Sequence, residues 1–171
     1  MKTLIPIFIL LHLFNASVMA QKDIRSTKLK EQHFTPKVVM PADTWKAKLT
    51  PLQYEVTRNK GTEYPGTGQY YNFYEKGNYY CSNCNALLFN SESKFKSGCG
   101  WPSFNDVASM QSINVITDKS HGMVRTEITC ANCEAHLGHV FEDGPPPTGL
   151  RYCINSASLK FIPDSKQQGK P

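Results

Sequence analysis

The residues with the clearest chemical potential in this sequence are its six cysteines. Four of them form two C-x-x-C pairs, inside the segments CSNCNALL and CANCEAHL, which share the pattern C-x-N-C-x-A-x-L. The pairs are Cys81 with Cys84 and Cys130 with Cys133. A C-x-x-C turn aims two sulfurs at one point, so two such turns can complete a tetrahedral zinc site. Because thiolates would fill all four positions, we expect one structural zinc ion per chain rather than a catalytic one.

Two other interpretations of these pairs remain open. In an oxidising compartment they are candidates for disulfides or for thioredoxin-like redox pairs. A redox pair usually follows a strand and opens a helix in a βαβ unit, and neither copy has that context. Two copies of the same turn also favour one shared ligand, so zinc is the preferred interpretation.

The two remaining cysteines, Cys99 and Cys153, have different surroundings. Cys99 lies in SGCGWPSF between two glycines, which permit a mobile loop with an accessible sulfur, and Trp101 follows it. Cys153 follows Arg151 on an expected strand, and a nearby cation lowers a thiol pKa because it stabilises the thiolate. The two thiols are therefore candidates for a reactive pair, and a static disulfide between them is the alternative.

The segment before Cys153 adds side chains of the kind that activate a thiol. HLGHVFEDGPPPTG contains two histidines and an aspartate, and an asparagine follows Cys153. These residues are His136, His139, Asp143 and Asn155. A thiol, two imidazoles, an amide and a carboxylate in one short segment indicate a nucleophilic thiol site. A second metal at the histidines is a weaker alternative, and Trp101 is either ordinary core or an aromatic wall for a small apolar group.

The elements that would position these residues are mostly strands. PADTWKAKLTPLQYEV predicts two short helices, the second with Thr50 as N-cap, Pro51 in its first position and Gln53 completing a capping box. From residue 70 onward, aromatic runs and the alternation in GMVRTEITC, LRYCI and SLKFI predict strands. We therefore expect a mainly β domain with a small helical piece at its N-terminal end.

The first 20 residues are typical of a secretory signal. Lys2 gives a positive start, the apolar run over residues 4–14 is too short to span a bilayer, and small residues precede a cleavage point after Ala20. The alternatives are an uncleaved membrane anchor and a disordered apolar N-terminus. We expect residues 1–20 to be removed, no stable membrane association afterwards, and an exported protein, either periplasmic or secreted.

The rest of the chain divides into three parts. We expect a flexible lead-in over residues 21–40, one domain over residues 41–163 and a disordered tail over residues 164–171. The net charge of +5 is spread along the chain and is densest near its two ends. No basic stripe of the kind that binds nucleic acid is present in the sequence, so we expect no nucleic-acid partner.

Taken together, these segments resemble the type B methionine sulfoxide reductases, which reduce the R-sulfoxide of methionine. The resemblance covers about residues 40–162 and runs through GTEYPGTGQY, SGCGWPSF, VRTEITC, HLGHVFEDGPPPTGLRYCINSASLKF and both C-x-x-C segments. It implies the Mss4-like fold of two small, coiled antiparallel sheets, with short N-terminal helices and a zinc-bearing end.

The resemblance also implies residue roles. The residue matching Cys153 is the nucleophile, which is left as a sulfenic acid, and the one matching Cys99 resolves it as a disulfide. Trp101 matches the residue that packs on the substrate methyl, while His139 and Asn155 match residues that hydrogen-bond around the sulfoxide oxygen. The residues whose counterparts support the site are His136, Asp143 and Arg151.

This chemistry suits the residue types. A sulfoxide is reduced only if its oxygen is protonated as a thiolate attacks sulfur, so we expect a proton-donor network beside a thiol of low pKa. The resulting sulfenic acid needs a second thiol to trap it. The implied partners are oxidised proteins or peptides as substrates and a thioredoxin-like reductant, which must be extracytosolic if the signal is cleaved. The competing hypotheses are a secreted zinc-ribbon binding module and a general thiol-disulfide oxidoreductase.

Overall fold

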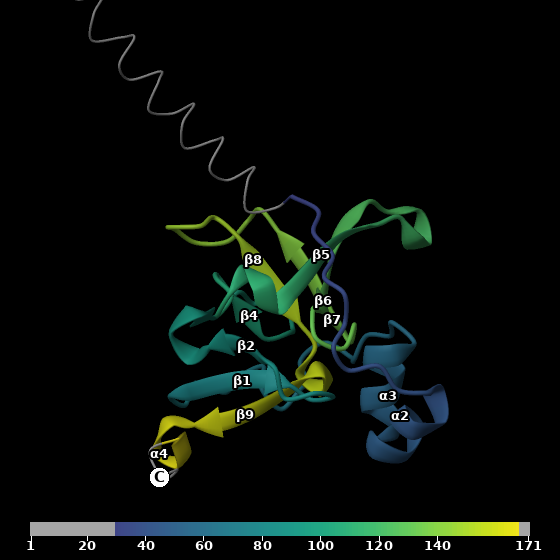
Figure 1. Ribbon diagram of the computed structural model, residues 1–171. Coiled ribbons are helices and arrows are strands. Elements are labelled where there is room, and N and C mark those ends of the chain that lie inside the picture. The colour runs from purple at the N-terminus through teal and green to yellow at the C-terminus, as the bar shows by residue number, and fades with distance from the viewer. Residues whose placement is uncertain (1–29, 168–171) are drawn as a thin grey trace, which may run out of the picture. The chain divides into compact units, whose positions relative to one another are not determined.

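A computed structural model of the chain describes residues 30–167 (Figure 1). The expected signal peptide, residues 21–29 of the expected lead-in and residues 168–171 of the expected tail lie outside these residues, and these parts stay predictions. The α-helices are α2 (Ala42–Lys48), α3 (Pro51–Arg58) and α4 (Asp164–Gln167). The strands are β1 (Gly77–Cys81), β2 (Leu87–Asn90), β3 (Lys94–Phe95), β4 (Ser103–Phe104), β5 (Ile113–Asp118), β6 (Arg125–Cys130), β7 (His136–Phe141), β8 (Arg151–Ile154) and β9 (Leu159–Pro163). Short 3-10 helices are η1 (Ser91–Ser93), η2 (Met110–Ser112), η3 (Ser120–Gly122) and η4 (Ser156–Ser158).

The strands form two antiparallel sheets, which confirms the expected mainly β fold. The smaller sheet has the order β2-β1-β9, and the larger has the order β3-β4-β8-β7-β6-β5. Figure 1 shows β1 and β9 side by side, with the larger sheet next to them and α2 and α3 together on one flank. In the larger sheet β8 lies between β4 and β7, so its residues face neighbours from two distant parts of the chain.

Buried aromatic rings join the two sheets. Tyr79 of β1 packs edge-on against Phe104 of β4, with ring centroids 5.0 Å apart. Phe89 of β2 stacks on the same Phe104 ring at 4.3 Å and also contacts Tyr152 of β8. All four rings are buried. Aromatic pairs of this kind stabilise a core beyond the area they bury, so this cluster fixes β8 relative to the smaller sheet.

The helix prediction is confirmed in its details. The Thr50 side chain accepts from the Gln53 backbone N–H, and the Gln53 side chain accepts from the Thr50 N–H, while Pro51 opens α3. Val56 of α3 is buried, and the helix contacts η4 and β7. The Arg58 guanidinium at the end of α3 donates to the Cys133 carbonyl at 2.8 Å, which ties this helix to the second C-x-x-C segment.

Both ends of the described region are more ordered than the sequence predicts. Gln32 forms a β-bridge with Val115 of β5, and Lys37 and Val38 both donate backbone hydrogen bonds to the Asn132 carbonyl. Residues 32–38, expected in a flexible lead-in, therefore add hydrogen bonds at the edge strand β5 and at the second C-x-x-C turn. Residues 164–167, expected in a disordered tail, form α4, and the Asp164 N–H bonds to the Lys76 carbonyl. Within residues 30–167 no helix is long and apolar enough to cross a membrane.

Candidate functional site

The four cysteines of the C-x-x-C pairs converge on one point. Their sulfurs all lie within 4.8 Å of one another. The Cys81 and Cys133 sulfurs are 3.7 Å apart, and those of Cys84 and Cys130 are 3.6 Å apart. A tetrahedral zinc ion with Zn–S bonds of about 2.3 Å would separate its sulfurs by about 3.8 Å. The cluster thus has the ligand type, number and spacing that such a site needs.

The two turns that present these sulfurs are built alike. In the first, Asn85 N–H donates to the Cys81 carbonyl at 2.9 Å, and in the second, Glu134 N–H donates to the Cys130 carbonyl at 2.8 Å. Asn85 and Glu134 both have positive φ, 59° and 60°. One turn follows β1 of the smaller sheet, and the other joins β6 to β7 of the larger sheet. A metal ion bound by both turns would therefore cross-link the two sheets.

The other two cysteines lie in direct contact with each other. Cys153 is on β8, where its Cα is paired with Ser103 of β4 on one side and with His139 of β7 on the other. Cys99 lies in the loop before β4, and its sulfur is 3.4 Å from that of Cys153. Both are free thiols. A small movement would bring the sulfurs to the distance of about 2.05 Å at which a disulfide forms.

The surroundings of the two thiols shift their pKa values in opposite directions. Burial raises the pKa of Cys99, but hydrogen bonds from Ser103 and Ser97 outweigh this and lower it to about 7. The Ser97 hydroxyl is 3.1 Å from the Cys99 sulfur, and that of Ser103 is 3.3 Å from it. Burial and the neighbouring Cys99 raise the pKa of Cys153 to about 12, against the opposing effect of Arg151. At neutral pH the Cys153 thiol is therefore protonated, whereas Cys99 is near the midpoint of its titration.

A small pocket of about 130 Å³ opens onto Cys153. Its walls are mixed: aromatic rings, backbone and a few polar groups. The lining residues are Thr62, Trp101, Arg125, Gly138, His139, Phe141, Cys153 and Asn155. Four of the residues that the sequence analysis singled out thus meet here, namely Trp101, His139, Asn155 and Cys153. The cavity has room for a small group such as a methyl sulfoxide, and Trp101 supplies an aromatic wall.

The aromatic wall is held by a loop whose Glu63 is buried. Trp101 Nε1 donates to the Glu63 carbonyl at 3.1 Å. The Glu63 carboxylate accepts from the Ser156 and Ala157 N–H groups at 2.6 and 3.0 Å. The Asn155 side chain accepts from Glu63 N–H and donates to a β7 carbonyl, both at 3.1 Å. Both ends of the Asn155 amide are therefore occupied by backbone, so this residue fixes the loop that carries the wall.

His139 has partners that the sequence analysis missed. Its Nε2 lies 2.9 Å from Oδ2 of Asp118, the last residue of β5. Arg125, the first residue of β6, donates from Nη2 to the same Asp118 oxygen at 2.7 Å. Burial lowers the pKa of His139 in spite of the Asp118 contact. The imidazole in the pocket wall is accordingly held by an aspartate and an arginine from two neighbouring strands.

His136 lies outside the pocket lining and is buried behind His139, with ring centroids 5.6 Å apart. Its Nδ1 is 2.7 Å from Oε1 of the buried Glu127, whose other oxygen accepts from Lys60 at 2.8 Å. Burial acts against ionisation of Glu127, but hydrogen bonds from His136 and Lys60 lower its pKa overall. His136 thus belongs to a buried polar network that supports the strand carrying His139.

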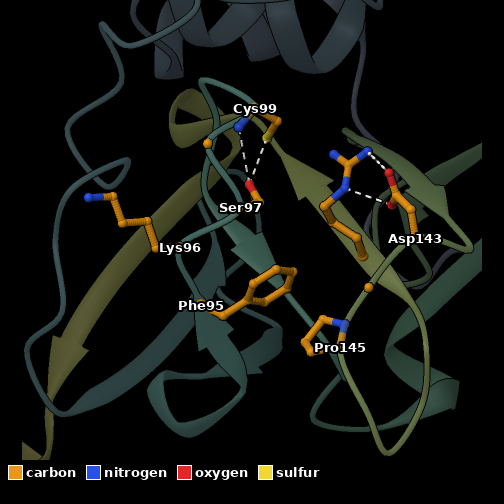
Figure 2. Close-up of a pocket in the computed structure, with 9 residues that line it drawn as sticks. Phe95, Lys96, Ser97, Cys99, Asp143 and Pro145 are labelled. Atoms are coloured by element: carbon orange, nitrogen blue, oxygen red, sulfur yellow. Dashed lines mark hydrogen bonds and ion pairs between the residues drawn. The ribbon is translucent and has the colours of Figure 1, made fainter.

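Asp143 and Arg151 lie on the other side of the sulfur pair. They line an open groove with Cys99 and do not line the pocket beside Cys153. Figure 2 shows Ser97 and Cys99 on one side of this groove and Asp143 on the other. Arg151 donates to both Asp143 oxygens at 2.8 Å and stacks on the Phe141 ring at 4.4 Å. The two sulfurs therefore face different openings.

Two of the missed residues, Arg125 and Glu127, could have been found from the sequence. They lie two positions apart in VRTEITC, which is an expected strand, so their side chains are on the same face of the sheet. Asp118 carries no comparable signal, because it reaches His139 only through the pairing of β5, β6 and β7.

Comparisons with known proteins agree with this site. A family model described as the SelR domain matches residues 49–163. A protein of Thiobacillus denitrificans named peptide methionine sulfoxide reductase MsrB is 56% identical over 119 residues, covering 70% of this chain and 90% of the relative. Proteins of the same name from Acinetobacter baylyi and Agrobacterium fabrum are 57% and 54% identical, over 71% and 75% of this chain and 88% and 96% of their own lengths.

Proposed function

Because the chain belongs to the SelR-domain family of type B methionine sulfoxide reductases, we propose that it reduces the R-epimer of methionine sulfoxide in peptides and proteins. The observation that carries the detailed mechanism is the contact of two free thiols, 3.4 Å apart, one of which, Cys153, lines a small pocket with an aromatic wall. Cys153 is the nucleophile of the proposed reaction, and Cys99 is the resolving thiol.

In the proposed first step the Cys153 sulfur attacks the sulfoxide sulfur. The bond from sulfur to oxygen in the substrate breaks, the oxygen passes to Cys153, and methionine leaves. The thiol proton is needed on that oxygen, and its transfer balances the step: thiol plus sulfoxide give sulfenic acid plus methionine. Because the pKa of Cys153 is raised and the thiolate is the attacking form, its proton must leave as the sulfur attacks. His139, the Cα partner of Cys153 across β7 and β8, is the group placed to pass it on.

In the second step Cys99 attacks the sulfenic sulfur of Cys153, a disulfide forms and water leaves. A thiol with a pKa near ambient pH is the best compromise between thiolate fraction and nucleophilicity. The pKa of about 7 at Cys99 has that value. Rapid resolution also protects the sulfenic acid from further oxidation.

The two openings support separate access for substrate and reductant. The substrate reaches Cys153 through the pocket, where the methyl packs on Trp101 and the oxygen lies on the His139 side. Only one configuration at sulfur satisfies both contacts while sulfur faces Cys153, which is the basis for R-selectivity. The wider groove exposes Cys99 to an extracytosolic, thioredoxin-like dithiol, which reduces the disulfide and is itself oxidised.

We assign the four-thiol cluster to zinc. When bound, the ion would hold four cysteine thiolates and join the two sheets, and it would have no part in the reaction because no ligand position is open. Elemental analysis of folded protein should give one zinc per chain, and metal-free protein of full activity would refute the assignment.

For localisation, we propose export with cleavage after Ala20. The supporting observation is the apolar run over residues 4–14 behind Lys2. N-terminal sequencing of the protein from the producing cells should begin at Gln21. A mature protein that retains Met1 in the cytosol would refute both export and the extracytosolic reductant.

The test of the mechanism is methionine formed per chain, by pre-reduced protein without added reductant. The wild type and Cys99→Ser should each form about one equivalent of methionine, because the first step does not need Cys99. Cys153→Ser should form none, since a serine hydroxyl is a far weaker nucleophile. Consumption of the R-sulfoxide with the S-sulfoxide left on a chiral column completes the test.

The two serine variants serve as controls for each other, because each removes one sulfur of the same contact. A burst from Cys153→Ser, or none from a folded Cys99→Ser, would reverse or remove the assignment. Equal behaviour of both variants, with lowered stability and no burst, would instead indicate a static disulfide. Equal turnover of the two epimers would refute the proposed orientation in the pocket.

A further inference from the structure

The Asp118 carboxylate makes hydrogen bonds to His139 and Arg125, two residues that line the pocket beside Cys153. Oδ2 faces His139 Nε2 at 2.9 Å and accepts from Arg125 at 2.7 Å, while Oδ1 accepts from the Ser120 N–H at 2.9 Å. Hydrogen bonds from Ser120, then the one from His139, hold the pKa of Asp118 well below its usual range. The carboxylate is therefore ionised at neutral pH.

An ionised carboxylate has only acceptors, so the nitrogen that bonds to it must carry a proton. This places a proton on His139 Nε2 in both the neutral and the charged ring. The difference between the two states then lies at Nδ1, which holds a lone pair in the neutral ring and a proton in the charged one. An aspartate that fixes the tautomer in this way decides which ring nitrogen can exchange protons.

Arg125 is in contact with both Asp118 and the pocket. Its Nη2 holds the Asp118 carboxylate, and the side chain lines the pocket that contains Cys153. Its Nε is buried and has no hydrogen-bond partner within residues 30–167. A pocket wall with a fixed positive charge and an unused donor is suited to keep Asp118 in place and to donate a hydrogen bond to an oxygen atom of a ligand.

We propose that Asp118, held by Arg125, is a positioning residue that keeps the proton of His139 on Nε2 and leaves Nδ1 as the site of proton exchange with the reacting groups. This inference rests on the proposed function, in which His139 passes the proton to the sulfoxide oxygen. Neither Asp118 nor Arg125 is adjacent to Cys153 in sequence. The β5-β6-β7 pairing brings Asp118 to His139 and Arg125 to the pocket wall.

The ionisable groups around His139 come from four strands. Asp118 is on β5, Arg125 and Glu127 are on β6, His136 is on the same strand as His139, and Cys153 is on β8. Asp118 favours the charged imidazole, whereas Arg125 and His136 oppose it. Removal of the Asp118 charge should therefore shift the titration of His139 to lower pH.

The first measurement needs no variant. Nitrogen-15 NMR of the histidine side chains in the reduced, zinc-loaded full chain should show the neutral His139 ring protonated at Nε2. A ring protonated at Nδ1 would overturn the proposal whatever the enzymatic activity. An inactive protein with the expected tautomer would count against the proposed function and not against this inference.

The second measurement uses Asp118→Asn. The asparagine oxygen can still accept from Ser120, so its amide NH₂ takes the place of Oδ2 and donates to His139 Nε2, which moves the ring proton to Nδ1. We expect the single-turnover rate of methionine formation to fall by about 10²-fold, within the range for a general acid-base group, with little change in substrate affinity. The pH profile of that rate should also move to lower pH.

Glu31→Gln is the matched control. Its carboxylate accepts from the backbone N–H of Thr117, next to Asp118 on the same strand, and lines a different surface cavity. Its rate, affinity and His139 tautomer should equal those of the wild type. Arg125→Lys keeps the positive charge and should retain the tautomer with a smaller loss of rate. Equal losses in Asp118→Asn and Glu31→Gln, or an unchanged rate in a folded Asp118→Asn, would overturn the proposal.

Discussion

Gly138 offers the most direct test of how closely β7 and β8 must approach for the site to form. It lines the pocket, precedes His139 and is paired with Ile154 of β8. Its φ is +155°, and a Cβ added there would lie 2.0 Å from the Cys153 carbonyl oxygen. Gly138→Ala should therefore push apart the two strands that carry the imidazole and the nucleophilic sulfur.

The size of the effect follows from that contact. Real Cβ atoms essentially never come closer than 3.0 Å to such an atom, so the strands must separate by about 1 Å. Such a shift lengthens hydrogen bonds of about 2.9 Å beyond the range in which they are strong. Backbone strain of about 1–3 kcal/mol and overpacking of about 1–3 kcal/mol together predict a loss of about 4 kcal/mol. For a domain of this size that lowers the melting temperature by about 10 °C.

Gly122→Ala is the matched control, because Gly122 also has positive φ, +69°, but nothing lies within 4 Å of its Cβ position. It should lose about 1–2 kcal/mol through backbone strain alone. Both variants should be melted at equal zinc and protein concentrations, and the single-turnover rate should be measured below the transition. Equal melting temperatures for the two variants, or a Gly138→Ala protein with the wild-type rate, would refute the close-approach argument.

Three further predictions follow from the same structure. In reduced protein, iodoacetamide should alkylate Cys99 first, at a rate that falls as the pH drops through about 7. Cys153 should stay unreactive at neutral pH because its pKa is raised to about 12. Peptide mapping that finds the opposite order of alkylation would contradict this prediction. A strong chelator, or Cys84→Ala, should release the metal and lower the melting temperature markedly, whereas Cys99→Ala should keep one zinc per chain. Glu127→Gln should cost about 2 kcal/mol in urea unfolding at pH 7, since the buried Glu127 side chain would lose its ion pair with the largely exposed Lys60 and its charged hydrogen bond with His136. The lowered pKa of Glu127 gives a contribution that is complete above its unfolded value of about 4.3 and is lost as pH falls further, so the gap between variant and wild type should narrow in acid.

Local sequence signals predicted the elements well where short-range physics decides. The capping box at Thr50 and the two C-x-x-C turns depend on residues three or four apart, and both are present as expected. Leu52 shows the limit of that approach, because it shares helical spacing with Val56 and yet is 53% exposed. Periodicity states which residues share a face, but the packing of α3 against η4 and β7 decides how much of that face is covered.

The sequence predicted which cysteine, histidine and tryptophan form the site, but it did not predict which charged residues hold them. Cys153, His139 and Trp101 share the pocket, but the carboxylate that holds His139 is Asp118 and not the nearer Asp143. Asp143 lies 4 positions after His139 and is instead paired with Arg151 on the groove side. Asp118 is 21 positions away and becomes a neighbour only through three-strand pairing, which a scan along the chain does not reveal.

The arginine beside Cys153 illustrates a related point about thiol activation. A cation near a thiol favours the thiolate, and Arg151 does lower the pKa of Cys153, yet burial and the neighbouring Cys99 outweigh it. The hydroxyls of Ser97 and Ser103 instead stabilise the charge on Cys99. This distribution suits the proposed reaction, because the nucleophile keeps the proton that the sulfoxide oxygen requires. It also leaves Cys153 largely protected from oxidants until a substrate enters, since oxidation proceeds through the thiolate.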